Sequence, residues 1–167
     1  MTIESSAVND AGNASVQCRL LHLYLKDVSF EAPRVPGILF GHGPPAVEYH
    51  VSNTYQLSVE ASRNLGEVYD VTVHVTVKAT GGDKVLFLIE VQQGGLFELK
   101  GYTAEEQETV LHTRAPEALY PYVRELVASL AHRAGFPRLS LQPIDFSARH
   151  AEETRERDVG AIDRSSQ

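Results

Sequence analysis

A run of alternating apolar and polar residues, a tight turn and a second alternating run constrain the fold of this chain more than any other feature. Over residues 69–78, apolar side chains at odd positions alternate with polar ones at even positions, the pattern of a strand with one buried face. Gly81, Gly82 and Asp83 then predict a tight turn, and residues 87–92 alternate again. The two runs are therefore predicted to form an antiparallel hairpin with one apolar and one polar face.

Two further strands are expected upstream of this hairpin. Residues 47–61 alternate, and residues 17–30 form a strand-like run with large apolar side chains on both faces, so this strand is expected to be covered on both sides for part of its length. One face is predicted to carry Leu20, Tyr24, Val28 and Phe30, and the other Leu21, Leu23, Leu25, Asp27, Ser29 and Glu31. Four such strands predict an antiparallel sheet that is solvated on one side.

The pattern changes to a helical one after residue 101. Thr103 and Glu106 form a capping box, which predicts a short helix that ends near Arg114. Prolines at 116 and 121 suit helix starts, and an apolar stripe at three-to-four spacing follows over residues 119–130. Gly135 predicts the end of that helix, and residues 139–146 are expected to pack back extended. Strands first and helices afterwards predict an α+β fold, with the helices on the apolar face of the sheet.

Length and composition favour one globular domain. The chain has 167 residues, of which 43% are hydrophobic and 22% charged. We expect a disordered tail over 1–16, a single domain over 17–147 and a charged helix or tail over 148–167. The net charge of −7 argues against binding to nucleic acid or to an anionic membrane.

Cysteine usage and the chain start indicate a cytoplasmic protein. The single Cys18 excludes an internal disulfide and a multi-cysteine metal site, which fits a reducing compartment. No apolar run is long enough to span a membrane, and the first residues lack the pattern of a signal peptide.

No constellation of residues predicts catalysis. The histidines are scattered without metal-ligand spacing, at positions 22, 42, 50, 74, 112, 132 and 150. Glu105, Glu106 and Glu108 are interpreted as a solvated helix start, and the glycine pairs lack the context of a phosphate loop. Cys18 has no base nearby in the pattern. We expect no enzyme activity, no metal and no cofactor.

Two features are typical of binding surfaces instead. The outward phase of the last strand mixes Leu88 with Glu90, a carboxylate beside an exposed apolar side chain. The proline- and glycine-rich loop over residues 32–45 carries Ile38, Leu39 and Phe40 at its middle. Three large apolar side chains in such a loop favour a role in binding.

Four blocks in register resemble the SecB family of bacterial protein-export chaperones. They are YLKDVSFEAP at 24–33, FLIEVQQGG at 87–95, LYPYVRE at 119–125, and GFP at 135–137 followed by LQPIDF at 141–146. The resemblance runs from about residue 20 to residue 146. It implies a four-stranded antiparallel sheet with helices on one face, assembled as a dimer of dimers in which the first strands pair and the short helix from Thr103 lies between sheets.

The resemblance also implies a function and its sites. It implies a holdase, without enzyme activity or nucleotide, that keeps precursor proteins unfolded and delivers them to the motor ATPase SecA. The acidic and apolar positions that bind SecA correspond to Asp27, Glu31, Leu88 and Glu90. The expected client-binding residues are Ile38, Leu39, Phe40, Leu119, Tyr120 and Tyr122, although core packing is an equally good reading of the helix. The expected oligomer interface contains Tyr24, Ile89, Val91 and Gln93.

The chain departs from the family pattern in three places, and other functions remain open. It has no tryptophan, although the family's loop usually carries one; residues 148–158 have little to bury; and Leu21 and Leu25 stand where polar outer-face residues are expected. Alternatives are a SecB-like chaperone dedicated to one client, such as an antitoxin, and an α+β domain that binds a small molecule between sheet and helices. An enzyme is the weakest alternative.

Overall fold

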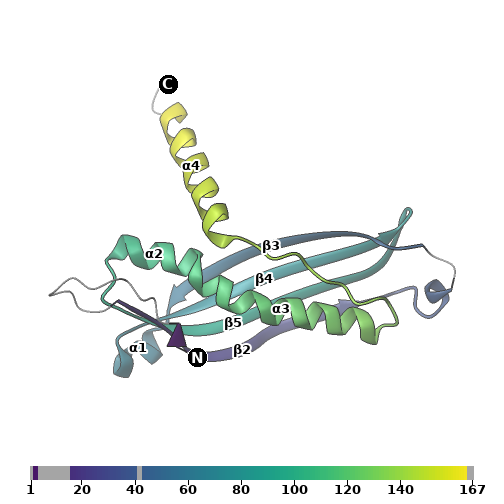
Figure 1. Cartoon of the computed structure of the whole chain (residues 1–167), viewed down its shortest axis with the longest axis horizontal. Coiled ribbons are helices and arrows are strands. Elements are labelled where there is room, and N and C mark those ends of the chain that lie inside the picture. The colour runs from purple at the N-terminus through teal and green to yellow at the C-terminus, as the bar shows by residue number, and fades with distance from the viewer. Residues whose placement is uncertain (1, 4–15, 41–42, 165–167) are drawn as a thin grey trace.

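The structure, a computed structural model, describes residues 2–3, 16–40 and 43–164. Its centre is an antiparallel sheet with the strand order β1-β2-β5-β4-β3 (Figure 1). The long strands are β2 (Gln17–Glu31), β3 (Ala46–Leu57), β4 (Glu67–Gly81) and β5 (Lys84–Lys100), and β1 (Thr2–Ile3) pairs with the start of β2. The predicted α+β fold, a four-stranded antiparallel sheet with helices packed on one face, is confirmed. The rest of the predicted tail, residues 1 and 4–15, lies outside the described residues.

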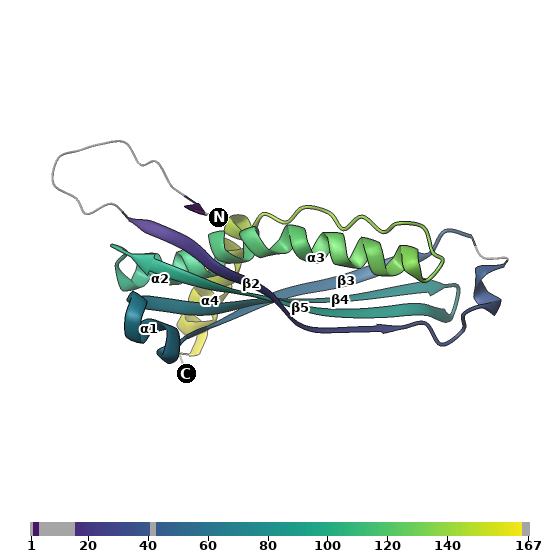
Figure 2. The same cartoon turned by 90° about the horizontal axis from the view of Figure 1, so that it is seen from below.

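Helices cover one face of this sheet, which we call the inner face. The helices α2 (Ala104–His112) and α3 (Arg114–Arg133) lie on it, and α1 (Val59–Leu65) sits at one end of the strands (Figure 2). A 3₁₀ turn, η1 (Gly37–Leu39), lies at the opposite end, and α4 (Phe146–Arg164) projects away from the body beyond β3 (Figure 1). Among the described helices, none is long and apolar enough to cross a membrane.

The core lies between α3 and the inner face. Leu119, Val123, Val127 and Ala131 follow one another at a spacing of four and are all fully buried. The first three belong to the predicted apolar stripe, whereas Tyr122, also predicted in it, is 41% exposed. The inner-face positions of β4 and β5, such as Val73 and Ile89, are buried beneath them. Contact is so close at Gly95 that an added Cβ would lie 2.8 Å from the Cδ2 atom of Leu119.

Three predicted local signals are confirmed. Gly82, with φ of 63°, forms the two-residue turn between β4 and β5. Thr103 and Glu106 form a reciprocal capping box at the start of α2. Gly135, with φ of 88°, ends α3 in a Schellman arrangement, in which the Phe136 N–H donates to the Ala131 carbonyl at 3.1 Å.

The predicted faces of β2 are wrong in the middle of the strand, because two irregularities shift its register. One lies between Leu20 and His22, and the other between Leu25 and Asp27. Between them the alternation is inverted: Tyr24 pairs with Gly94 on the outer face, and Leu25 pairs with Gln93 on the inner face. Beyond the second irregularity, residues 27–31 return to the predicted phase.

The predicted ends of two elements are also wrong. The strand expected over 47–61 ends at Leu57, and the chain then turns into α1 although its apolar alternation continues. The Ser58 N–H donates to the Val68 carbonyl at 2.7 Å, and Gly66, with φ of 95°, reverses the chain. Pro121 lies inside α3 rather than at a helix start.

Candidate functional site

The outer face, opposite α3, holds the four residues expected to bind SecA in one cluster. Glu31 lies directly opposite Leu88, and Ser29 lies opposite Glu90, so the carboxylate of Glu90 is diagonal to Asp27 and Glu31. Ser29 Oγ donates to Glu90 at 3.4 Å. We call Asp27, Glu31, Leu88 and Glu90 the docking strip. The helices α2 and α3 lie on the other face of the sheet (Figure 2).

The acids of the docking strip are exposed and hold no ion pair. Asp27, Glu31 and Glu90 are all exposed, and the ion pairs of the described residues are formed by Glu98 and Glu153 instead. Like charges on one face repel one another mildly, which gains nothing for folding. A basic partner would relieve this repulsion, and Leu88, which is half-buried, adds apolar surface to the contact.

The other half of the outer face is closed by its own side chains. Tyr24 lies over Gly94, where an added Cβ would be 2.3 Å from the ring, and its hydroxyl donates to Asp70. Burial first, and then the Asp70 carboxylate, raises the pKa of Tyr24 to about 12. The phenol therefore stays protonated as a donor at neutral pH.

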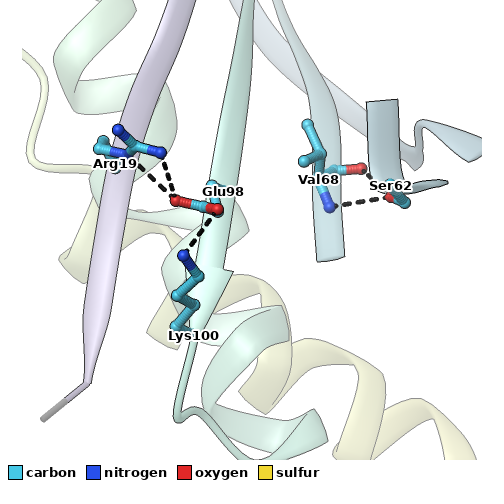
Figure 3. A network of polar contacts seen from close by, with 5 residues as sticks. All are labelled: Arg19, Ser62, Val68, Glu98 and Lys100. Atoms are coloured by element: carbon cyan, nitrogen blue, oxygen red, sulfur yellow. Dashed lines mark hydrogen bonds and ion pairs between the residues drawn. The ribbon is translucent and has the colours of Figure 1, made fainter. Parts of the chain in front are cut away.

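A buried carboxylate, that of Glu98, lies further along β5 on the same face (Figure 3). The side chain of Glu98 is 1% exposed; Arg19 Nη2 lies 2.8 Å from one oxygen, and Lys100 Nζ lies 2.9 Å from the other. Val68, which is fully buried, pairs with Glu98 across the strands, and its N–H donates to Ser62 Oγ of α1 at 3.0 Å. Lys100 first, and then Arg19, holds the pKa of Glu98 below its usual value despite burial.

The sequence did not reveal this network, which depends on the strand register. Arg19 and Glu98 are 79 residues apart and become neighbours only through the pairing of β2 with β5. A polar residue at position 98, within an otherwise apolar stretch, is the one signal that marks it. We call Arg19, Tyr24, Asp70, Glu98 and Lys100 the closed half of the outer face.

The residues expected to bind clients fall into two groups. Ile38, Leu119 and Tyr120 are buried, and the Tyr120 hydroxyl donates to the Gln142 carbonyl at 2.9 Å, which fastens the segment after α3. Phe40 is 82% exposed, Leu39 38% and Tyr122 41%. Leu39 packs beside Gly135, about 20 Å along α3 from Tyr122 at 1.5 Å per residue. The exposed members therefore form two separate places.

The residues expected at the oligomer interface are mostly inside the single chain. Ile89, Val91 and Gln93 are buried on the inner face, and Gln93 Nε2 donates to the Tyr24 carbonyl at 2.7 Å. Their side chains have no free surface there. One exposed apolar row was not predicted from the sequence. It lies on β2, is not covered by α3, and consists of Leu23, Leu25 and Val28.

The described residues offer little for a metal or for nucleophilic chemistry. No group of three or more His, Cys, Asp and Glu among them could hold a metal ion. Burial raises the pKa of the Cys18 thiol to about 11, so the thiol is protonated and a poor nucleophile at neutral pH. The close contact at Gly95 leaves no room for a ligand at that point between the sheet and α3, which counts against a small-molecule site there.

The fold defines the class of protein first. It is shared with the SecB-like chaperone Rv1957 of Mycobacterium tuberculosis, solved in complex with a ChAD peptide from the HigA1 antitoxin, with a TM-score of 0.59 and 19% identity over 76% of this chain and 87% of that one. The fold is therefore that of a SecB-like chaperone. Residues 11–157 match the family described as "Preprotein translocase subunit SecB".

Curated relatives agree with this match. The protein-export protein SecB of Xanthomonas oryzae is 35% identical over 92% of this chain and 86% of its own length. That of Xylella fastidiosa is 38% identical over 81% of this chain and 75% of its own length. The chain belongs to the SecB family of protein-export chaperones.

Proposed function

We propose that this chain is a cytoplasmic holdase that keeps precursor proteins unfolded and delivers them to SecA. Its curated relatives are named protein-export proteins, which favours export over a dedicated antitoxin client, the kind of peptide bound by the more distant structural neighbour. The observation that carries the proposal is the docking strip: three unpaired carboxylates beside Leu88 on the uncovered face of the sheet. They have no folding role that would explain them.

We assign SecA binding to this strip. A basic segment would be steered to the three carboxylates, and Leu88 would contribute the part of the contact that salt does not screen. Unlike Glu98 in the closed half, the three acids of the strip are exposed.

We assign client binding to Leu39 and Phe40 at the η1 end of the molecule. A holdase needs exposed apolar surface without a specific pocket, because its clients share only exposed hydrophobic segments. Phe40 offers the most exposed large apolar side chain among the described residues. Ile38 beneath it is buried and anchors the loop.

The decisive experiment separates the two sites by charge reversal. Glu90→Lys should abolish binding to SecA and leave suppression of client aggregation unchanged. Glu48→Lys is the matched control, because Glu48 is an exposed acid on the same face, two strands away on β3. The proposal fails if Glu90→Lys binds SecA normally at low salt, or if it loses both activities together.

A second experiment tests the client site. The double variant Leu39→Ser/Phe40→Ser should weaken suppression of client aggregation while its melting temperature stays near that of the wild type. The control is Leu57→Ser/Val59→Ser, which removes two apolar side chains that are 49% and 65% exposed at the opposite end of the sheet. Equal holdase activity in both double variants would remove the loop from the site.

We also propose a homotetramer, a dimer of dimers in which β2 edges pair. Within the described residues, the edge of β2 that points away from β5 is paired only at Cys18 and Arg19, where β1 lies beside it. An open edge with Leu23, Leu25 and Val28 exposed beside it invites pairing with a second copy. Light scattering that shows a stable monomer at micromolar concentration would contradict this assembly.

A further inference from the structure

The contact between α2 and α4 is built around two stacked histidines. His112 lies in the last turn of α2 and His150 near the start of α4, with ring centroids 4.8 Å apart and ring planes inclined by 11°. The ring of Tyr55 on β3 meets His112 edge-on, with a centroid distance of 5.1 Å. His112 therefore contacts one ring of the sheet and one ring of α4, and both histidines are half-buried.

Few other side chains hold α4 against the body. Phe146, which is 3% exposed, anchors the first turn against the ring of Tyr120 at a centroid distance of 5.7 Å. The side chains at 154–157 are exposed, and α4 projects away from the body (Figure 1). Among the described residues, the His112–His150 stack is thus the last aromatic contact along α4, one turn beyond a fixed start.

The ring nitrogens of His150 make the stack sensitive to protonation. Nδ1 of His150 is buried and has no hydrogen-bond partner among the described residues. A neutral imidazole can carry its proton on Nε2, so that Nδ1 needs no acceptor, whereas an imidazolium has an N–H on both nitrogens. Protonation of His150 in the closed contact would therefore bury a charged donor without an acceptor, which is costly.

The surroundings of His112 can offset one positive charge but not two. The charged and titratable groups that face it come from three elements: Glu108 from α2, Tyr55 from β3, and His150, Glu153 and Arg157 from α4. Glu153 is already paired with Arg149 at 3.0 Å, which leaves Glu108 and the C-terminal end of α2 to stabilise a cation. Burial first, and then His150, lowers the pKa of His112. The neutral form of His112 is thus favoured while the contact is closed.

We propose that His112 and His150 form a proton-operated latch: α4 stays packed against α2 while the pair carries at most one proton, and protonation of both rings releases α4 beyond Phe146. Two imidazolium rings with centroids 4.8 Å apart repel each other in a half-buried contact, so the two titrations are coupled. Phe146 keeps the first turn in place, and α4 therefore swings without leaving the chain.

The sign of the pH dependence follows from the closed contact. A histidine whose pKa is lowered in the closed state stabilises that state fully above its ordinary pKa of about 6.5 and loses the stabilisation as pH falls below it. The latch is therefore closed at neutral pH and opens in mild acid.

The test uses the full chain with a nitroxide spin label on α4. Thr154→Cys places the label on an exposed position one turn beyond His150 and on the same side of the helix, whereas Cys18, 1% exposed, is not accessible to the reagent. Lowering the pH from about 7.5 to about 5 should increase the mobile fraction of the label about fivefold, because two like charges then oppose the contact.

The variants His150→Phe and His112→Phe each keep a ring in the stack and remove one titrating group. In either variant the mobile fraction should change by less than about 1.5-fold over the same pH range, since a single cation can lie against an aromatic ring without repulsion. His50→Gln is the control, because His50 is an exposed histidine of β3 outside the stack, and this variant should respond like the parent.

The latch is wrong if the label on the parent chain is equally mobile at both pH values. It is also wrong if His150→Phe responds as fully as the parent, or if His50→Gln removes the response. Thermal melts of each variant at both pH values confirm that the body of the protein stays folded, so that mobility of the label reports on α4 alone.

Discussion

The two halves of the outer face use the same residue types in opposite ways. In the closed half, the carboxylate of Glu98 is buried between Arg19 and Lys100, and Tyr24 donates to Asp70. In the docking strip, Asp27, Glu31 and Glu90 are exposed without an ion pair. An acid held by two cations is already satisfied and serves the sheet, whereas unpaired acids are available to a partner.

The largest expected effect is a loss of stability from filling the closed half. Gly94→Val places a side chain where the Tyr24 ring lies, so the ring must leave and its hydrogen bond to Asp70 is lost. We expect a loss of about 2–3 kcal/mol in the free energy of unfolding. Gln92→Val, two residues away on the same face near the docking strip, should change it by less than about 0.5 kcal/mol. Urea titration at one fixed protein concentration measures both, and equal stabilities would remove the distinction between the halves.

The second effect separates a paired acid from an unpaired one. Arg19→Met leaves Glu98 with Lys100 alone, and we expect a loss of about 1–2 kcal/mol. We keep this figure small because the side chain of Arg19 is 40% exposed, so water screens its charge. Glu31→Gln should be neutral within about 0.5 kcal/mol.

The same pair predicts a dependence on pH with a definite sign. The folded pKa of Glu98 lies below its ordinary value of 4.5, so the wild type holds the stabilisation fully above about 4.5 and loses it as pH falls through the folded pKa. The difference between wild type and Arg19→Met should therefore shrink in acid. A difference that stays constant down to pH 3 would show that Arg19 acts by packing alone.

The third effect separates the apolar contribution of the docking strip to SecA binding from its electrostatic contribution. Leu88→Ser should weaken SecA binding by about tenfold through lost apolar burial and leave its salt dependence unchanged. Asp27→Asn should weaken binding less and should reduce the salt dependence, because it removes a screened charge. Binding measured over a range of salt concentrations distinguishes the two. If both variants change the salt dependence equally, Leu88 does not supply the apolar part of the contact.

The docking strip could be placed on one face from the sequence because its alternation is unbroken. Residues 27–31 and 87–92 each keep their phase, and two short regular runs are enough to put Glu31, Leu88 and Glu90 on the same side. Tyr24 and Leu25 could not be placed, because a register shift leaves no mark in an apolar and polar pattern where both faces carry leucines.

Which side chains are buried in α3 and in the closed half depends on long-range contacts that the local sequence pattern does not reveal. Tyr120 and Tyr122 are two residues apart in α3 and therefore point to different sides of the helix. Tyr120 is buried and its hydroxyl donates to the carbonyl of Gln142 in the segment after α3, whereas Tyr122 is 41% exposed. The Arg19–Glu98 pair likewise exists only through the register of β2 against β5. Local pattern predicts elements and faces, and long-range pairing decides which polar groups are satisfied.

The smallest expected effect lies at the border of the two halves, at His74. Burial first, and then the ammonium of Lys26, lowers the pKa of this imidazole, whose Nε2 lies 3.1 Å from Thr54 Oγ1. The neutral form is therefore favoured in the folded chain, and its stabilisation is complete above about 6.5 and is lost as pH falls below that value. Protonation also adds a positive charge beside the docking strip, because His74 lies opposite Gln92, which in turn lies opposite Asp27.

Lowering the pH from about 7.5 to about 5.5 should thus weaken binding of a basic segment by about twofold. His74→Gln keeps a hydrogen-bonding side chain for Thr54 and removes the titration, so its affinity should change less over the same range. His132→Gln is the control, because His132 is exposed in the last turn of α3 on the other side of the sheet. If His74→Gln and the wild type show the same dependence on pH, the border histidine does not sense the docking strip, and the two halves of the outer face act independently.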